Sequence, residues 1–415
     1  MGRVAALAAL LLGVCAAAAP AGTEPERVYA LLSDSQPAVL AEVDARTLKP
    51  VSAARVSLGT LGRWSFSSNG KALAVSTGFV PRSGTPTPVQ LRFVDLAGMR
   101  LTGSVRLGPD PGLSTGYIDP VVLVSWITPD IVVAIRQRAN RSLELAGVDA
   151  GKRSVRWRRP LSGVVLASAP VGGELALLVG KEGQIVAPRL VVVGADGTIR
   201  SAELSRLRAG WSWQDANPPR GEVRMPGLAV DVATRTAYVA APSGLVAEIV
   251  LDGLGVRYHP LRGTFAKYQS GAVRQAVSVG GGVLAVAGSN STVEKNTKGE
   301  LFQVTRGSGL ELIDTRTGVT RSIDAIATSI ALWQGGLVAA SRSWDSRVSA
   351  QIGGGLAIFD REGVPGVRLF AGSPVSLVGV HGTLAYAYVG NDRVTVDLAA
   401  GRVIGRGSGA LPLLR

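Results

Sequence analysis

The feature that most constrains this chain is a short pattern that recurs along nearly its whole length. One half of the pattern is an apolar run, a tight turn and a second apolar run, found at 64–78, 226–244, 271–289, 327–343 and 373–390. The other half has three or four alternating apolar residues, a turn and a further strand, found at 40–51, 91–102, 145–155, 190–200, 248–257, 310–320, 356–367 and 394–403. Alternation of this kind is typical of β-strands. The repetition therefore predicts a series of similar β-sheets.

An aspartate opens most of the turns in the second half of the pattern. These residues are Asp44, Asp95, Asp149, Asp252, Asp314, Asp360 and Asp397, with Gly194 at the fourth position. An Asp side chain that ends a strand can accept hydrogen bonds from backbone N–H groups about two residues on, while glycine supplies a positive φ. One aspartate per repeat at a turn indicates a structural role and not carboxylate chemistry.

A repeat of roughly 40 to 50 residues with four strands in each unit is typical of propeller blades. The predicted fold is all-β, a single closed β-propeller, with eight four-stranded blades favoured and seven as the alternative. The first unit lacks its innermost strand. We expect residues 410–414 (ALPLL) to supply that strand and close the ring, which leaves only short, protected sheet edges.

Two stretches resemble known propeller families. FSSNGKALAVS at 66–76 resembles the second half of a WD-repeat, YVTN-repeat or TolB-type blade, and GVDAGKRSVRW at 147–157 resembles a blade of the pyrroloquinoline-quinone-like propellers. The resemblance covers essentially the whole chain after its first residues. It implies the propeller superfold and does not specify an activity.

The first 21 residues have the pattern of a secretory signal peptide. A positive start is followed by an apolar stretch from Val4 to Val14 and by small residues up to Ala21. We expect cleavage after Ala21, a propeller domain over 22–415, and a secreted or extracytoplasmic location in the cell envelope. Leu12 to Cys15 faintly resembles a bacterial lipobox, so a lipid anchor on Cys15 is the alternative, although Val14 departs from that pattern. Cleavage after Ala21 would remove the only cysteine and exclude disulfides, thiolate metal sites and cysteine nucleophiles.

Two long apolar stretches do not predict membrane spans. Residues 119–136 are interrupted by Pro129 and Asp130, and residues 163–180 are interrupted by Pro170 and by 172–174. Each is interpreted as a buried hairpin of the repeat, so no transmembrane segment is expected once the signal peptide is removed.

The chain is basic, with a formal net charge of +14. One interpretation is attraction to an anionic surface or partner. The other, which we favour, is arginine enrichment without function, because no run of basic residues concentrates the charge. Nucleic acid is not expected as a partner of an exported protein.

Loop lengths point to one face of the ring. The turns between the first and second and between the third and fourth strands of each unit are short, and the side that carries them is called the short-turn face. The other connections are longer and irregular and define the long-loop face, with expected loops at 78–88, 107–119, 207–226, 262–270, 288–309 and 342–354. Long loops on a rigid scaffold are where binding residues usually lie.

Aromatic and charged residues are concentrated in these expected loops and form the candidate binding site. They are Tyr117, Asp119, Trp211, Trp213, Asp215, Lys267, Tyr268, Arg342, Trp344 and Asp345. Exposed Trp and Arg are enriched among residues that dominate binding energy. The alternative is that Trp211 and Trp213 only pin a long loop. Trp64, Trp126 and Trp333 lie on predicted innermost strands and are interpreted as core residues.

No catalytic pattern occurs in the sequence. The two histidines, His259 and His381, fall in different repeats, and no nucleophile elbow, phosphate loop or HExxH motif is present. We expect a non-catalytic, monomeric binding or scaffold propeller without a cofactor. Its expected partner is an envelope or extracellular protein, a peptide or an anionic polymer. The alternative is a lactonase-like or glycosidase-like hydrolase acting at the channel mouth, for which Asp119, Asp215 and Asp345 would be the loop carboxylates.

Overall fold

The described part of the computed structural model is composed of strands joined by turns, and it contains no helix. It comprises residues 27–32, 37–77, 88–109, 121–138, 142–214, 220–260, 271–407 and 411–413. The predicted signal peptide, residues 1–21, lies outside the described residues. So do nearly all of the expected loops at 78–88 and 107–119 and the whole of the one at 262–270.

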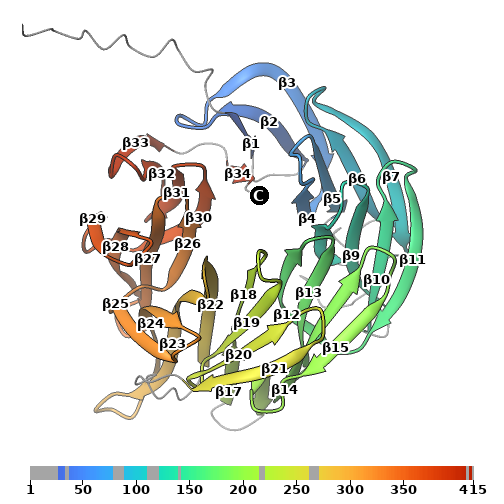
Figure 1. Ribbon diagram of the computed structural model, residues 1–415. Coiled ribbons are helices and arrows are strands. Elements are labelled where there is room, and N and C mark those ends of the chain that lie inside the picture. The colour runs from blue at the N-terminus through green and yellow to red at the C-terminus, as the bar shows by residue number, and fades with distance from the viewer. Residues whose placement is uncertain are drawn as a thin grey trace, which may run out of the picture.

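The strands form radial sheets arranged in a ring (Figure 1). Five of these sheets have four strands each and run up and down from the ring axis outward. In order along the chain, they are composed of β34 (Leu411–Leu413), β1 (Arg27–Leu31), β2 (Ala38–Asp44) and β3 (Pro50–Gly59); β4 (Leu61–Phe66), β5 (Ala72–Thr77), β6 (Val89–Asp95) and β7 (Arg100–Gly108); β8 (Val121–Trp126), β9 (Ile131–Gln137), β10 (Leu143–Asp149) and β11 (Ser154–Leu161); β18 (Gly227–Asp231), β19 (Thr236–Ala241), β20 (Leu245–Val250) and β21 (Gly255–Pro260); and β30 (Val375–His381), β31 (Leu384–Val389), β32 (Asp392–Asp397) and β33 (Arg402–Gly407).

The remaining strands belong to one 14-stranded sheet. They are β12 (Val164–Val171), β13 (Glu174–Lys181), β14 (Gln184–Gly194), β15 (Ile199–Glu203), β16 (Ala209–Gln214), β17 (Arg220–Met225), β22 (Gly271–Gly280), β23 (Val283–Lys295), β24 (Leu301–Asp314), β25 (Val319–Asp324), β26 (Ser329–Trp333), β27 (Gly336–Asp345), β28 (Ala350–Asp360) and β29 (Pro365–Leu369). The all-β propeller class is confirmed. Hydrogen bonding joins the four-strand runs β12–β15, β22–β25 and β26–β29 into one sheet instead of leaving them separate.

The ring closes where the two ends of the described chain meet. Strand β34 pairs antiparallel with β1, with Tyr29 opposite Leu413 and Leu31 opposite Leu411. Leu413 is 3% exposed and packs in the core shared with the next sheet. The prediction that residues 410–414 supply the missing innermost strand is confirmed.

Burial follows the position of a strand within its sheet. Every residue of β10 except the last is buried, whereas most residues of the outermost strand β11 are exposed. The middle strands are buried on both faces because each sheet packs against a neighbour on either side. Phe93 of β6 and Trp126 of β8 meet across one such interface, edge to face, with ring centroids 6.0 Å apart. Trp126 is therefore a core residue, as its repeat position predicts.

The aspartate turns form largely as predicted. Asp44 Oδ1 accepts hydrogen bonds from the backbone N–H groups of Arg46 (3.1 Å) and Thr47 (2.7 Å). Corresponding backbone bonds are accepted by Asp149, Asp314, Asp360 and Asp397. In the fourth turn, which has Gly194 at the marker position, Asp196 accepts the bond instead.

The residue that adopts a positive φ in these turns is not always a glycine. Glycine adopts it in four of them, for example Gly318, but Leu48, Met99, Arg153 and Leu254 adopt φ between 44° and 55° in the others. Three of those four turns contain a glycine that does not take the left-handed position. The turn geometry therefore fixes which residue is left-handed, and glycine is not required there.

Three of the expected long loops are regular β-structure. Residues 209–214 and 220–225 form the antiparallel strands β16 and β17, residues 288–309 lie almost entirely within β23 and β24, and most of 342–354 lies within β27 and β28. The polar segment at 289–306, interpreted from the sequence as a flap or a solvated excursion, is a hairpin with its tip at 296–300. These expectations of irregular structure were wrong, because the strands simply continue past the end of the repeat and keep their pairing.

Arginines connect neighbouring sheets and account for part of the basic charge. Arg158 of β11 donates to the backbone carbonyl of Leu107 at 2.7 Å, and Arg189 of β14 donates to that of Ser162 at 2.6 Å. Arg158 also bonds the buried carboxylate of Glu144, together with Arg136 and Arg138. Burial alone would raise the pKa of Glu144, but the hydrogen bonds from the three arginines outweigh it and lower the pKa to about 2.

Candidate binding surface

Six of the ten residues proposed from the sequence can be placed in the structure only in part or not at all. Tyr117, Asp119, Asp215, Lys267 and Tyr268 lie outside the described residues, and of Trp213 only the backbone, within β16, is described. Trp211, Arg342, Trp344 and Asp345 are fully described. Trp211 lies on β16 and the other three lie on β27, and both strands belong to the 14-stranded sheet.

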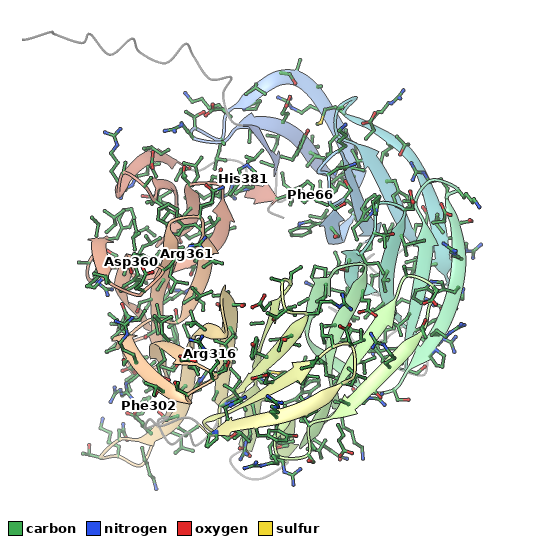
Figure 2. All side chains as sticks on the ribbon, viewed as in Figure 1. Phe66, Phe302, Arg316, Asp360, Arg361 and His381 are labelled. Carbon is green, nitrogen blue, oxygen red and sulfur yellow. The ribbon has the colours of Figure 1, made fainter. Side chains whose placement is uncertain are left out.

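Strand extensions on the long-loop face form a continuous layer, which we call the rim sheet. It consists of β16, β17, the first residues of β22, the far ends of β23 and β24, and the neighbouring ends of β27 and β28. β16 pairs with β17, β17 runs parallel to β22, and β24 pairs with β27 at Val304–Asp345 and Thr305–Trp344. The hairpin of β23 and β24 extends beyond the outline of the ring (Figure 1). In Figure 2, Phe302 marks this hairpin, far from the inner strands that carry Phe66 and His381.

The register of the rim sheet aligns six residues in one row across six strands. Trp211 is opposite Val223, Val223 opposite Gly271, and Gly271 opposite Ser291. Ser291 is opposite Thr305, which in turn is opposite Trp344. We call these residues, Trp211, Val223, Gly271, Ser291, Thr305 and Trp344, the tryptophan row.

Contacts confirm that the row lies on a single face. A Cβ placed on Gly271 would lie 3.6 Å from the Cβ atoms of both Val223 and Ser291. The Ser291 and Thr305 hydroxyls are 2.8 Å apart and hydrogen-bonded. Trp211 is partly exposed and Trp344 is 39% exposed. The structure therefore brings Trp211 and Trp344 onto one surface, at its two ends.

The alternate positions of the same strands carry the charged side chains. Glu222 pairs with Arg224 at 2.6 Å, Glu294 pairs with Arg306 at 2.7 Å, and Asp345 pairs with Arg347 at 2.5 Å. Glu294 also contacts Arg347 at 3.4 Å. Because cross-strand neighbours share a face and successive residues alternate, these pairs lie on the opposite face from the tryptophan row.

The two remaining predicted residues are engaged within the protein. Asp345 is 7% exposed, and the hydrogen bond from Arg347 is the main cause that lowers its pKa to about 2. A carboxylate held in this way is a weak base, which does not suit the proton transfer that a hydrolase would require of it. The Arg342 guanidinium donates to Ser376 Oγ of β30 at 2.8 Å, so it connects the rim sheet to the neighbouring sheet.

A concave feature also lies at the ring axis. A cavity of about 460 Å³ is bordered by innermost strands from several sheets and is lined mainly by apolar residues: Trp64, Val277, Ile330, Ala331, Leu332, Val378, Gly379, Val380 and Pro412. None of these side chains is ionisable. The described residues that line this cavity therefore offer no acid, base or nucleophile.

Groups that could support catalysis or metal binding are dispersed. His259 Nε2 lies 2.8 Å from Glu248 Oε2 on the outer part of one sheet, whereas His381 ends the innermost strand β30 of another. Within the described ranges, no group of three or more His, Cys, Asp and Glu side chains is placed to hold a metal ion. None of the described segments forms a helix long and apolar enough to cross a membrane.

Comparisons with known proteins agree with the fold. No protein-family model matches the chain, and no curated protein matches it. Among solved structures, it is similar to the dihydro-heme d1 dehydrogenase NirN in complex with DHE, with 13% identity over 95% of this chain and 76% of that chain and a TM-score of 0.56. It also matches BamB from Moraxella catarrhalis, with 14% identity over 90% of this chain and 94% of that chain and a TM-score of 0.44. The similarity to NirN agrees with the β-propeller fold, and it extends to the fold alone.

Sequence reasoning missed several residues that share the face of the row. Val293 is 40% exposed and Leu301 is 48% exposed, and both occupy positions that alternate in step with Ser291 and Thr305. The sequence carries little signal for them, because neither STVEK at 291–295 nor LFQVT at 301–305 alternates strictly between apolar and polar residues. The pairing between units, which aligns Trp211 with Trp344, has no such signal in the sequence.

Proposed function

We propose that this chain is an exported, non-catalytic β-propeller of eight blades that binds a protein, a peptide or a cell-envelope polymer through its long-loop face. The sequence pattern of the first 21 residues supports export. The two histidines lie on different sheets, and among the described residues no group of three or more His, Cys, Asp and Glu side chains is placed to hold a metal ion. We therefore favour binding over hydrolysis.

Sheet pairing supports eight blades. Five four-stranded sheets are separate, and the 14-stranded sheet contains three further runs of four strands, β12–β15, β22–β25 and β26–β29. The strands left over are β16 and β17, which belong to the rim sheet. Each of the eight units also contains one turn of the aspartate series, counting the turn after Gly194.

The observation that carries the binding proposal is the exposed apolar face of the rim sheet. Trp344, Val293 and Leu301 are 39%, 40% and 48% exposed on strands held rigidly by pairing. Exposed aromatic and aliphatic side chains gathered on one face of a soluble protein commonly mark an interaction site. A rigid backbone beneath them reduces the entropy lost on binding.

Retention of a partner from envelope extract of the native host tests the proposal. Wild-type protein and the variant Trp211→Ala/Trp344→Ala would be immobilised side by side. The matched control is Val232→Ala, because Val232 is 60% exposed but lies in a turn on the short-turn face. We expect a specific component to be retained by the wild type and the control and lost by the double variant. Equal retention by all three would contradict a role for this face.

Export is tested separately by determining the N-terminus of protein recovered from the extracytoplasmic fraction. Cleavage after Ala21 predicts an N-terminus at Gly22. Protein found only in the cytoplasm with Met1 present would contradict export. A lipid-modified N-terminus at Cys15 would instead support the tethered alternative.

A further inference from the structure

We propose that the tryptophan row binds a neutral, linear polysaccharide composed of β-linked hexopyranoses, which lies along the row with sugar rings stacked on Trp211 and Trp344. This inference rests on the proposed function and narrows its ligand to one class. The argument comes from the length of the row, the size of its middle residues, the hydrogen-bonding groups beside it and the placement of charge.

The length of the row suits an extended polymer. From Trp211 on β16 to Trp344 on β27 there are five steps between neighbouring strands, or about 24 Å at the usual strand spacing. A single small molecule cannot contact both indoles over that distance. A chain of several linked sugar rings can.

The middle of the row is low. Gly271 has no side chain and is buried, and Ser291 and Thr305 are small and half-buried, so these three residues of the row project little above the sheet. A large residue at any of these positions would block a ligand lying flat across the sheet. The two indoles therefore bound a shallow platform and not a closed pocket.

The chemistry of the platform matches that of a sugar ring. An equatorially substituted pyranose presents C–H groups on its faces and hydroxyls around its edge. Indole rings offer a large apolar face to the former. The hydroxyls of Ser291 and Thr305 and the exposed amides of Gln303 and Gln351 supply donors and acceptors to the latter. Gln303 is opposite Val293 and Gln351 is opposite Trp344, so both amides share the face of the row.

The placement of charge favours a neutral ligand over an anionic one. The chain has a net charge of +14, yet no residue of the row is charged. Arg224, Arg306 and Arg347 lie on the other face, each paired with a carboxylate. On the row's own face, Arg342 bonds Ser376 and Lys295 lies at the hairpin tip. An anionic polymer would require cations along its path, and the six residues of the tryptophan row include none.

Titration with defined oligosaccharides tests the proposal. Cellohexaose and chitohexaose would be titrated into the full-length mature protein, with binding followed by calorimetry and by tryptophan fluorescence. We expect binding of at least one of them with little dependence on salt concentration. Trp211→Ala and Trp344→Ala should each weaken it about tenfold or more, whereas the control Val232→Ala should leave it unchanged.

Two further variants and ligands locate the site within the row. Thr305→Arg keeps both tryptophans but places a long charged side chain on the platform, and it should also abolish hexasaccharide binding. The corresponding disaccharides are too short to reach both indoles, so they should bind more weakly than the hexasaccharides. Substituting both tryptophans should therefore weaken disaccharide binding less than it weakens hexasaccharide binding. Circular dichroism and thermal unfolding would establish that each variant is folded.

Specific outcomes would overturn the inference. It fails if folded wild-type protein binds neither hexasaccharide, if binding survives both tryptophan substitutions, or if only an anionic polymer such as polygalacturonate binds and salt abolishes that binding. If the hexasaccharides do not bind but the tryptophan variant loses an envelope protein, the glycan inference fails and the proposed function stands. If neither is observed, both fail.

Discussion

The ring and the rim sheet are made of the same kind of strand but are stabilised differently. In the ring, strands such as β10 are buried on both faces and their turns are fixed by aspartates. In the rim sheet, the far ends of β23, β24 and β27 are paired through their backbones but are exposed on one face, where Val293, Leu301 and Trp344 meet solvent.

This difference places the residues that stabilise the ring and those proposed to bind a ligand in separate regions of one architecture. The ring obtains its stability from side chains buried between neighbouring sheets, so each substitution there is expected to be costly. The rim sheet obtains its shape from backbone hydrogen bonds inherited from the ring, which leaves its exposed side chains free to serve a ligand. Substitutions should therefore have large effects on folding in the ring and small ones in the rim sheet.

Opening the ring should have the largest effect. Removal of the residues from 408 onward eliminates β34 and with it the pairing to β1 and the buried side chain of Leu413. Loss of one buried leucine alone typically costs about 2–5 kcal/mol, and the removal also exposes a sheet edge. We expect the free energy of unfolding in urea to fall by more than about 4 kcal/mol.

The matched comparison is a shortened rim hairpin. Replacing residues 294–302 with a two-residue Asn-Gly turn should lower the free energy of unfolding by less than about 1 kcal/mol, because most of the side chains removed are exposed or half-buried. A loss in the shortened hairpin as large as that caused by opening the ring would break the distinction between the two regions.

The tryptophans provide the next sharpest contrast. Trp126 is 8% exposed, packs on Phe93 and donates from Nε1 to the carbonyl of Pro129 at 3.2 Å. Trp126→Ala should cost about 3–5 kcal/mol, as expected for an aromatic residue in a core. Trp344→Ala should cost less than about 1 kcal/mol while weakening the proposed ligand binding about tenfold or more. Chemical denaturation of both variants gives the comparison directly, and a costly Trp344→Ala would assign that residue to structure instead.

The sequence could predict the role of a residue in this contrast only where that residue occupies a repeated position. Trp126 occupies a repeated strand position, so its burial follows from alternation and periodicity. The closing strand at 411–413 was likewise predictable, because one unit lacked its innermost strand. Trp211 and Trp344 were recognised as candidate binding residues by type alone. Their alignment depends on β17 pairing with β22 and β24 pairing with β27. Those contacts join different units, and nothing in a single repeat specifies them.

A third expected effect concerns the buried ion cluster at Glu144. Its side chain is 3% exposed and is bonded by Arg136, Arg138 and Arg158. Glu144→Gln removes the carboxylate that all three arginines bond and leaves their positive charge uncompensated. We expect it to lower the free energy of unfolding by about 3 kcal/mol. The paired rim substitution Asp345→Asn should cost much less, because the Arg347 guanidinium remains half exposed to water.

The same cluster predicts that the free energy of unfolding decreases at acid pH. The pKa of Glu144 in the folded protein, about 2, lies below its ordinary value of 4.5. The stabilisation is therefore complete above about pH 4.5 and is lost as the pH falls through about 2. Urea unfolding of wild type and Glu144→Gln between these limits should converge at the acid end. A difference that stays constant over this range would show that the carboxylate's charge is not the source of the stabilisation.

The smallest expected effect distinguishes two turns of the ring itself. Burial alone would raise the pKa of Asp44, but hydrogen bonds from the Thr47 backbone and hydroxyl and from the Arg46 backbone outweigh it, so the pKa is lowered. Asp44→Ala removes these bonds and should cost about 1 kcal/mol. Asp95 occupies the same position one repeat later, but the contact described for its carboxylate is the exposed ion pair with Arg100 at 3.5 Å. Asp95→Ala should therefore cost less than about 0.5 kcal/mol. Equal costs for the two substitutions would contradict this expectation. They would indicate that the aspartates stabilise the ring through a feature common to all the turns, and not through the backbone hydrogen bonds that Asp44 accepts.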